Sequence, residues 1–228
     1  MKGVILAAGI GKRLRPFTYF LPKPLLRLGD KPIIEHIIDW LRINDINEII
    51  IITNSQGRIM EKIYQDFQGI TFVYSKPLGT AGQLLAVKDK IKETFVIVYC
   101  DIITNFSLKK MVDFHIKSSS TFTIATLDLS FPIRYGVITS TKEGKVKRWD
   151  EKPKIKIKVN SGIYIAEPKI FDYINPNTIS HMNELVTELL KNGLNVFSYN
   201  IEGEYYDVGT LQDYINICKL YDKKLGEI

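Results

Sequence analysis

Apolar and polar positions alternate along the first half of the chain in blocks that predict strands and helices in turn. Short apolar runs predict β-strands over residues 2–7, 48–52, 70–74 and 95–99. The segments between them predict α-helices near residues 32–43, 56–66 and 80–90. This β-α-β alternation implies a doubly wound, mainly parallel sheet of the α/β class, whose ligands bind at the carboxyl ends of the strands.

The second half of the chain is denser in strands. Its pattern predicts strands over residues 121–128, 135–139, 145–149, 158–166 and 195–199. It predicts helices near residues 107–117, 181–191 and 210–223. We therefore expect the sheet to continue as a mixed sheet with a β-rich lobe. Because no linker rich in proline, glycine or serine separates the halves, the sequence predicts one domain over residues 1–228, with halves 1–105 and 106–228.

Composition agrees with this fold class. Of the 228 residues, 45% are hydrophobic and 25% are charged, as in ordinary globular proteins. No apolar run approaches membrane-spanning length, and the first residues resemble a core strand more than a signal peptide, so we expect a cytoplasmic protein that binds no membrane. Two cysteines are too few for a disulfide framework, and the three histidines lack metal-ligand spacing.

The chain carries a formal net charge of +6 at pH 7, which could suggest a nucleic-acid partner. No nucleic-acid-binding motif accompanies that charge. A lysine-rich solvated surface and an anionic small-molecule substrate are the favoured explanation, and we expect no nucleic-acid partner.

The most informative segment follows the first predicted strand. Small residues over 7–11 let backbone N–H groups close around an anion, because no large side chain blocks the approach. Lys12, Arg13 and Lys23 then bring positive charge, so the segment predicts a polyphosphate site. A P-loop is excluded because Arg13 stands where Ser or Thr is required. A dinucleotide loop is excluded because Leu14 replaces its third glycine.

Residues 6–18, Leu-Ala-Ala-Gly-Ile-Gly-Lys-Arg-Leu-Arg-Pro-Phe-Thr, with Pro-Lys-Pro at 22–24, resemble the signature of the sugar-1-phosphate nucleotidyltransferases, also called nucleotide-sugar pyrophosphorylases. Further segments follow in that family's order: 28–35, 77–82, 98–101, 135–137, 151–153 with 160–162, and 206–210. The resemblance thus covers the whole chain. It implies a Rossmann-like nucleotidyltransferase fold, with a nucleotide-binding half over 1–105 and a sugar-binding half plus C-terminal helix over 106–228.

The resemblance also implies a reaction, in which a nucleoside triphosphate and a sugar 1-phosphate give a nucleotide sugar and pyrophosphate. A sugar phosphate is largely dianionic at neutral pH, so this reaction needs no general base. It needs relief of the repulsion between two polyanions, which a divalent cation and several basic side chains supply. By motif, Asp101 and Asp207 are the expected Mg²⁺ ligands, and Asp101 directly follows a predicted strand.

The same resemblance assigns roles to individual side chains. The expected catalytic residues are Arg13, on the β- and γ-phosphates, Lys23, between the phosphates of both substrates, and Lys152, on the sugar phosphate. The expected sugar-binding residues are Gly136, Glu151 and Asn160. The expected nucleotide-binding residues are Leu6, Ala7, Ala8, Gly9, Gly11, Lys12, Gly79, Thr80 and Gln83. The competing explanations are solvated surface charges for Arg13 and Lys23, a strand-end ion pair for Glu151 with Lys152, and turn residues for Gly136 and Asn160.

The segments Leu-Gly-Thr-Ala-Gly at 78–82 and Asn-Ser-Gly at 160–162 look most like mannose-1-phosphate guanylyltransferases, so GTP and mannose 1-phosphate are the first choice of substrates. Uridylyl, thymidylyl or adenylyl transfer to another sugar 1-phosphate stays open, because Ser75 and Lys76 depart from the family pattern next to the base site. No hexapeptide repeat follows Thr210, so we expect no C-terminal β-helix domain.

Two further departures matter. Cys100 replaces the glycine that usually precedes the metal-binding aspartate, which leaves open a non-catalytic nucleotide-sugar-binding regulatory subunit. Tyr205 replaces a common tryptophan, a packing change that we expect to be harmless. The family often forms dimers and tetramers, and the apolar spacing over residues 211–225 fits either core packing or the interface of a homo-oligomer.

Overall fold

A seven-stranded sheet forms the centre of the computed structural model, which describes residues 1–176 and 178–226. Its strand order is β12-β8-β11-β6-β1-β4-β5. The strands are β1 (Lys2–Leu6), β4 (Glu48–Thr53), β5 (Ile70–Tyr74), β6 (Phe95–Tyr99), β8 (Phe122–Pro132), β11 (Lys154–Ala166) and β12 (Val196–Asn200). β11 runs antiparallel to β6 and to β8, and the other pairings are parallel, so the predicted mixed, mainly parallel sheet is confirmed.

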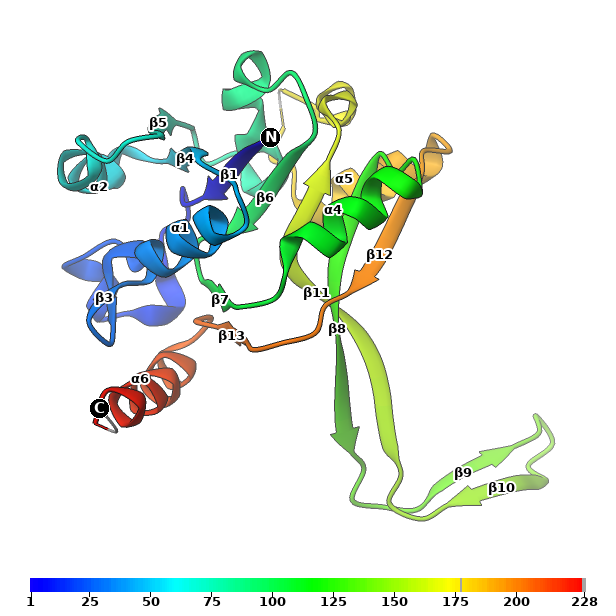
Figure 1. Cartoon of the computed structure of the whole chain (residues 1–228). Helices are drawn as coiled ribbons and strands as arrows, with labels where there is room; N and C mark the ends of the chain where they lie inside the picture. Colours follow the sequence, from blue (N-terminus) through cyan, green and yellow to red (C-terminus); the bar gives the residue numbers. More distant parts are fainter. Residues whose placement is uncertain (177, 227–228) are drawn as a thin grey trace.

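Helices cover both faces of the sheet, as a doubly wound fold requires (Figure 1). The longer ones are α1 (Ile33–Ile43), α2 (Arg58–Tyr64), α4 (Leu108–Lys117), α5 (Met182–Lys191) and α6 (Leu211–Gly226). One hydrophobic cluster packs α1 and α4 against the sheet through Ile37 and Met111, and a second packs α5 against the opposite face through Leu185. Among the described residues, no helix is long and apolar enough to cross a membrane.

The prediction of an α-helix near residues 80–90 is wrong, because most of this segment forms another type of helix. The structure has one α-helical turn, α3 (Gly79–Gly82), followed by a 3₁₀-helix over Gln83–Lys90. Leu84 and Val87 are both fully buried and lie three residues apart. Because a 3₁₀-helix has three residues per turn, it keeps these two side chains on one face.

The sequence pattern did not predict four short strands, because two or three residues are too few to show a period. β7 (Ile102–Thr104) pairs with β13 (Tyr205–Asp207), and β2 (Arg27–Leu28) pairs with β3 (Lys31–Pro32). The first pair matters for the site, because it brings the segment before α6 back to the carboxyl end of β6. The last two residues of the predicted domain, 227 and 228, lie outside the described residues.

β8 and β11 are longer than the sequence pattern predicts, and together they leave the body of the protein as a two-stranded arm. β9 (Val137–Ser140) and β10 (Val146–Asp150) form a hairpin at its tip (Figure 1). In register, Phe131 faces Ile155 and Leu129 faces Ile157, and all four side chains are 40–48% exposed. These residues lie outside the strands predicted from the sequence, and they form an apolar face that the rest of the described chain leaves open to solvent.

The burial of β4 between β1 and β5 can be tested by truncating one of its side chains. Ile51 is fully buried, so Ile51→Ala should lower the free energy of unfolding by about 2 to 5 kcal/mol, measured by urea denaturation. The matched control is Ile43→Ala in α1, because Ile43 is 82% exposed, and its effect should stay within about 0.5 kcal/mol. Equal losses for the two variants would contradict the described core.

Candidate active site

The small-residue loop that follows β1 is anchored at both ends. The backbone N–H of Ala7 donates to the carbonyl of Ile52 (2.8 Å), and the Asn54 amide donates to the carbonyl of Ala8 (2.9 Å). At the other end, the Thr18 hydroxyl donates to the carbonyl of Gly11 (2.9 Å). Sequence reasoning missed the role of Asn54, although its position directly after an apolar strand offered a signal.

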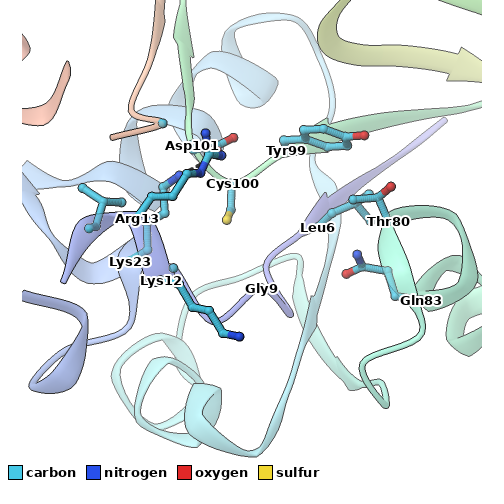
Figure 2. A pocket seen from close by; sticks show the side chains of 13 residues that line it. Leu6, Gly9, Lys12, Arg13, Lys23, Thr80, Gln83, Tyr99, Cys100 and Asp101 are labelled. Atoms are coloured by element: carbon cyan, nitrogen blue, oxygen red, sulfur yellow. Dashed lines mark hydrogen bonds and ion pairs between the residues drawn. The ribbon is translucent and has the colours of Figure 1, made fainter. Parts of the chain in front are cut away.

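A pocket of about 320 Å³ opens at the carboxyl ends of β1 and β6 (Figure 2). Nine residues predicted from the sequence line it: Leu6, Gly9, Gly11, Lys12, Arg13, Lys23, Thr80, Gln83 and Asp101. A second pocket of about 240 Å³ shares Gly9, Thr80 and Gln83 with the first, and Ala8 and Gly79 line this second pocket. Ala7, the first residue of the loop, is buried. The structure therefore gathers the whole predicted nucleotide-binding group at one edge of the sheet.

One side of the first pocket is charged. Lys23 is 8% exposed, and its ammonium lies 2.6 Å from Oδ2 of Asp101. A lysine this deeply buried is uncommon unless it is paired, and Asp101 provides the pair. In Figure 2, Arg13 and Lys12 lie on the same side of the pocket as this ion pair. Three basic side chains and one carboxylate therefore line this side of the pocket, and the basic side chains suit the binding of a polyphosphate.

The two predicted metal ligands lie close together. Asp207 is the last residue of β13, opposite Ile102 of β7, and the N–H of Val208 donates to the carbonyl of Asp101 (2.9 Å). Partial burial, and next the negative charge of Asp101, raise the pKa of Asp207, while Lys23 and Arg13 oppose that rise. A bound cation would favour the charged carboxylate instead.

These residues fit a magnesium ion. No group of three or more His, Cys, Asp or Glu side chains gathers into a metal site within the described residues. Mg²⁺ does not need such a group, because one or two carboxylates suffice when phosphate oxygens and water complete its shell. Cys100 lines the pocket beside Asp101, and burial raises the pKa of its thiol to about 12. The neutral thiol thus adds no further negative charge.

The other side of the pocket is uncharged and includes Leu6, Thr80, Gln83 and Tyr99 (Figure 2). Gln83 is 6% exposed, and its Nε2 donates weakly to the carbonyl of Gly79 (3.3 Å). Its Oε1 is buried and has no hydrogen-bond partner among the described residues. An unpaired buried acceptor is costly, so a ligand N–H or O–H group at this position would restore a missing hydrogen bond.

The structure does not bring the predicted sugar-binding residues and Lys152 into either pocket. Gly136, Glu151 and Lys152 lie on the arm, where Gly136 packs against the ring of Trp149 and the Trp149 indole donates to Glu151 (3.1 Å). Asn160 lies in β11, with its side chain bonded to Tyr164 (2.7 Å). Contact between these residues and a sugar therefore stays a prediction from the sequence.

Comparison with known proteins adds independent findings. The nucleotidyl transferase family model matches residues 2–224. The chain is 34% identical to the probable mannose-1-phosphate guanylyltransferase 1 of Oryza sativa subsp. japonica, over 97% of this chain and 64% of the relative. It is 33% identical to the mannose-1-phosphate guanyltransferase of Yarrowia lipolytica, over 100% of this chain and 66% of the relative. The chain thus spans about two thirds of the length of these relatives.

Solved structures agree on the fold. A Bacillus anthracis protein, described as a glucose-1-phosphate thymidylyltransferase and solved with sucrose, is similar with a TM-score of 0.77 and 27% identity, over 97% of this chain and 95% of that one. HddC from Yersinia pseudotuberculosis is similar with a TM-score of 0.73 and 23% identity, over 96% of this chain and 99% of that one. The second similarity bears on the fold alone.

The turn at Gly79 can be tested against a second glycine. Gly79 has φ +81°, and an added Cβ would lie 2.4 Å from the carbonyl oxygen of Ser180. Gly193 also has a positive φ, +69°, but nothing lies within 4 Å of an added Cβ. Gly79→Ala should therefore cost at least about 3 kcal/mol of unfolding free energy, and Gly193→Ala about 1 to 2 kcal/mol, by urea denaturation. Equal costs would contradict the described contact with Ser180.

Asp207 should reduce the stability of the ligand-free protein. Partial desolvation and the neighbouring charge of Asp101 disfavour the ionised form of Asp207, but solvent screens this effect because the residue is exposed, so Asp207→Asn should raise the free energy of unfolding at neutral pH by less than about 1 kcal/mol. The exposed Asp66 serves as the control, since Asp66→Asn should leave the urea midpoint unchanged. A destabilised Asp207→Asn variant would show that the carboxylate has a structural role.

Proposed function

Because the chain belongs to the nucleotidyl transferase family, we propose that it transfers a nucleotidyl group from a nucleoside triphosphate to a sugar 1-phosphate and releases pyrophosphate. The observation that carries this proposal is the pocket itself, where Lys23, Arg13 and Asp101 face an uncharged wall. GTP and mannose 1-phosphate are the substrates that we propose, in line with the names of the similar guanylyltransferases.

The reaction requires little covalent chemistry from the protein. A phosphate oxygen of the sugar 1-phosphate attacks the α-phosphorus of the triphosphate, and the bond to the bridging oxygen breaks as pyrophosphate leaves. The nucleophile is already ionised at neutral pH, so no proton needs to be removed. Lys23 and Arg13 reduce the repulsion between the two anions and stabilise the charge that develops on the leaving group.

Mg²⁺ is the cofactor that we propose, with Asp101 and Asp207 as the side chains that would hold it. Such an ion neutralises phosphate charge and acts as a Lewis acid. In the ligand-free protein, the Lys23 ammonium provides the positive charge next to Asp101. This ion pair also keeps Lys23 at the edge of the pocket, where incoming phosphate oxygens could accept from the same ammonium.

The nucleoside would lie along the loop that follows β1. Gly9 and Ala8 leave the backbone open there, and the two adjoining pockets share Thr80 and Gln83. The unpaired Oε1 of Gln83 accepts hydrogen bonds, which suits the N–H groups on the edge of a guanine. The same atom also suits the N–H of a uracil or thymine, so this contact alone does not separate the bases.

We keep Gly136, Glu151, Asn160 and Lys152 as proposed contacts to the sugar 1-phosphate. Three of them lie on the arm, so contact requires the arm to approach the pocket when substrate binds. Homo-oligomer formation likewise stays a prediction from the resemblance, and cytoplasmic location stays a prediction from the composition.

The proposal is tested by measuring pyrophosphate release with Mg²⁺ over a grid of GTP, UTP, dTTP, ATP and CTP against mannose, glucose, N-acetylglucosamine and heptose 1-phosphates. We expect the highest kcat/KM for GTP with mannose 1-phosphate. A high value for another pair would keep the reaction but correct the substrates. A blank grid, with nucleotide sugars still bound in calorimetry, would instead favour the regulatory-subunit alternative.

The proposed machinery is tested with two matched carboxylates. Asp101 and Asp172 each pair with a lysine, Lys23 at 2.6 Å and Lys88 at 3.4 Å, but only Asp101 lines the pocket. Asp101→Asn should lower kcat by at least about 100-fold with folding intact by circular dichroism. Asp172→Asn should leave kcat unchanged. Wild-type turnover in Asp101→Asn would refute the assigned role.

A further inference from the structure

Three side chains form a hydrogen-bonded chain that ends at the pocket, and its direction can be worked out from one end. The backbone N–H of Gly162 donates to Oδ1 of Asn160 (3.0 Å). Because an N–H group needs an acceptor, this contact fixes which end of the Asn160 amide is the oxygen. The other end, Nδ2, therefore points to the Tyr164 hydroxyl (2.7 Å) and donates to it.

The direction continues through the two phenols. Since the Tyr164 oxygen accepts from Asn160, its own hydrogen is free to donate to the hydroxyl oxygen of Tyr99, which lies 3.1 Å away. Tyr164 is only 1% exposed, and its ring stacks on Phe122 with ring centres 5.2 Å apart, so the middle of the chain is held in place. Its burial, with the neighbouring Tyr99 as the next cause, raises the pKa of Tyr164 and keeps it protonated.

Tyr99, the last phenol of this chain of hydrogen bonds, is one of the residues that line the pocket. Tyr99 is the last residue of β6 and lines the first pocket. Its oxygen accepts from Tyr164, and no described residue accepts the hydrogen of Tyr99. In Figure 2 its ring lies on the uncharged side of the pocket with Thr80 and Leu6, away from Lys12 and the ion pair.

We infer that Tyr99 is a specificity-determining residue, which donates a hydrogen bond to a hydroxyl oxygen of the substrate. Asn160 and Tyr164 are the positioning residues that direct this hydrogen into the pocket. The inference rests on the proposed function and assigns to Tyr99 a role that the sequence motifs did not include. It also gives Asn160 a second role, as the first donor of the chain, in addition to its proposed contact with the sugar.

Gln83 complements this donor. The same uncharged wall carries the unpaired acceptor Oε1 of Gln83, so it offers one donor and one acceptor to the ligand. A site that supplies both discriminates against analogues that lack either partner, because a buried polar group is then left unpaired. The substrate oxygen that accepts the hydrogen bond from Tyr99 can belong to the sugar or to the nucleoside, and deoxy analogues distinguish these two sources.

The first experiment compares wild type with Tyr99→Phe, using deoxy analogues of the sugar 1-phosphate and the 2′-deoxynucleoside triphosphate. We expect wild type to favour the parent substrate about 5- to 10-fold over one of these analogues in kcat/KM, and we expect this preference to disappear in Tyr99→Phe. The analogue that shows the effect identifies the oxygen. If Tyr99→Phe retains every preference of wild type, the inference is wrong.

The second experiment reverses the chain of hydrogen bonds without removing a phenol. In Asn160→Asp, a carboxylate oxygen replaces the amide donor, so the Tyr164 hydroxyl donates to the carboxylate. The Tyr164 oxygen then accepts a hydrogen bond from the Tyr99 hydroxyl. Asn160→Asp should therefore lower kcat/KM about 5- to 10-fold, as Tyr99→Phe does, but by less than about 2-fold when made in the Tyr99→Phe background. An equal loss in both backgrounds would show that Asn160 acts independently of Tyr99 and would overturn its positioning role.

Tyr214→Phe is the matched control. The Tyr214 hydroxyl donates to the carbonyl of Arg27 (2.7 Å), outside the pocket, so its loss should not change substrate preference. If wild type has no turnover, the proposed function fails, and calorimetry of a guanosine diphosphate sugar then decides the inference alone. Binding about 5- to 10-fold weaker in Tyr99→Phe would support the inference, and unchanged binding would overturn it.

Discussion

The parallel pairing of β1 with β6 is the constraint on which the site depends. In this register Leu6 faces Tyr99, so the glycine loop that follows β1 and the acidic turn that follows β6 begin at the same height of the sheet. Each neighbour then adds one component. β4 holds the loop through Asn54, and β11, on the other side of β6, places Tyr164 next to Tyr99. A shift of one residue in this pairing would turn Tyr99 to the opposite face and separate Asp101 from the loop.

On the charged side of the pocket, the side chains that suit phosphate and cation binding lower the stability of the ligand-free protein. Lys23 is buried, and its charge is balanced by Asp101 at 2.6 Å. Asp207 lies next to the same pair, and Lys23 and Arg13 only partly offset the effects of its desolvation and of the neighbouring Asp101 carboxylate. Removing charges from water costs free energy that one ion pair only partly recovers. The ligand-free protein thus keeps an arrangement that becomes favourable when phosphate and a cation bind.

Sequence patterns predicted most of the elements, and the residues that they assigned to the nucleotide gather around two adjoining pockets, for a physical reason. Runs such as Glu48–Thr53 are buried on both faces, so their composition alone identifies them, and the loop over residues 7–11 carries its chemistry in local sequence. The hydrogen-bonded chain from Asn160 to Tyr99 could not be predicted, because it joins β11 to β6 across the sheet and its direction depends on the orientation of one amide. The 3₁₀ geometry at Gln83–Lys90 and the reach of the arm depend likewise on tertiary packing.

The arm has a consequence for the behaviour of this protein in concentrated solution. Lys154, Lys156 and Lys158 alternate with Ile155 and Ile157, so the arm is cationic on one face and apolar on the other. A two-stranded ribbon has open edges, and an exposed apolar ribbon is a template for edge-to-edge association with other copies. Lysines along such a ribbon repel a second copy, and their repulsion is screened within about 10 Å at 0.1 M salt. The resistance of this protein to self-association therefore depends on the alternation of lysine and isoleucine in β11. Low ionic strength preserves that resistance, because it leaves the repulsion between lysines unscreened.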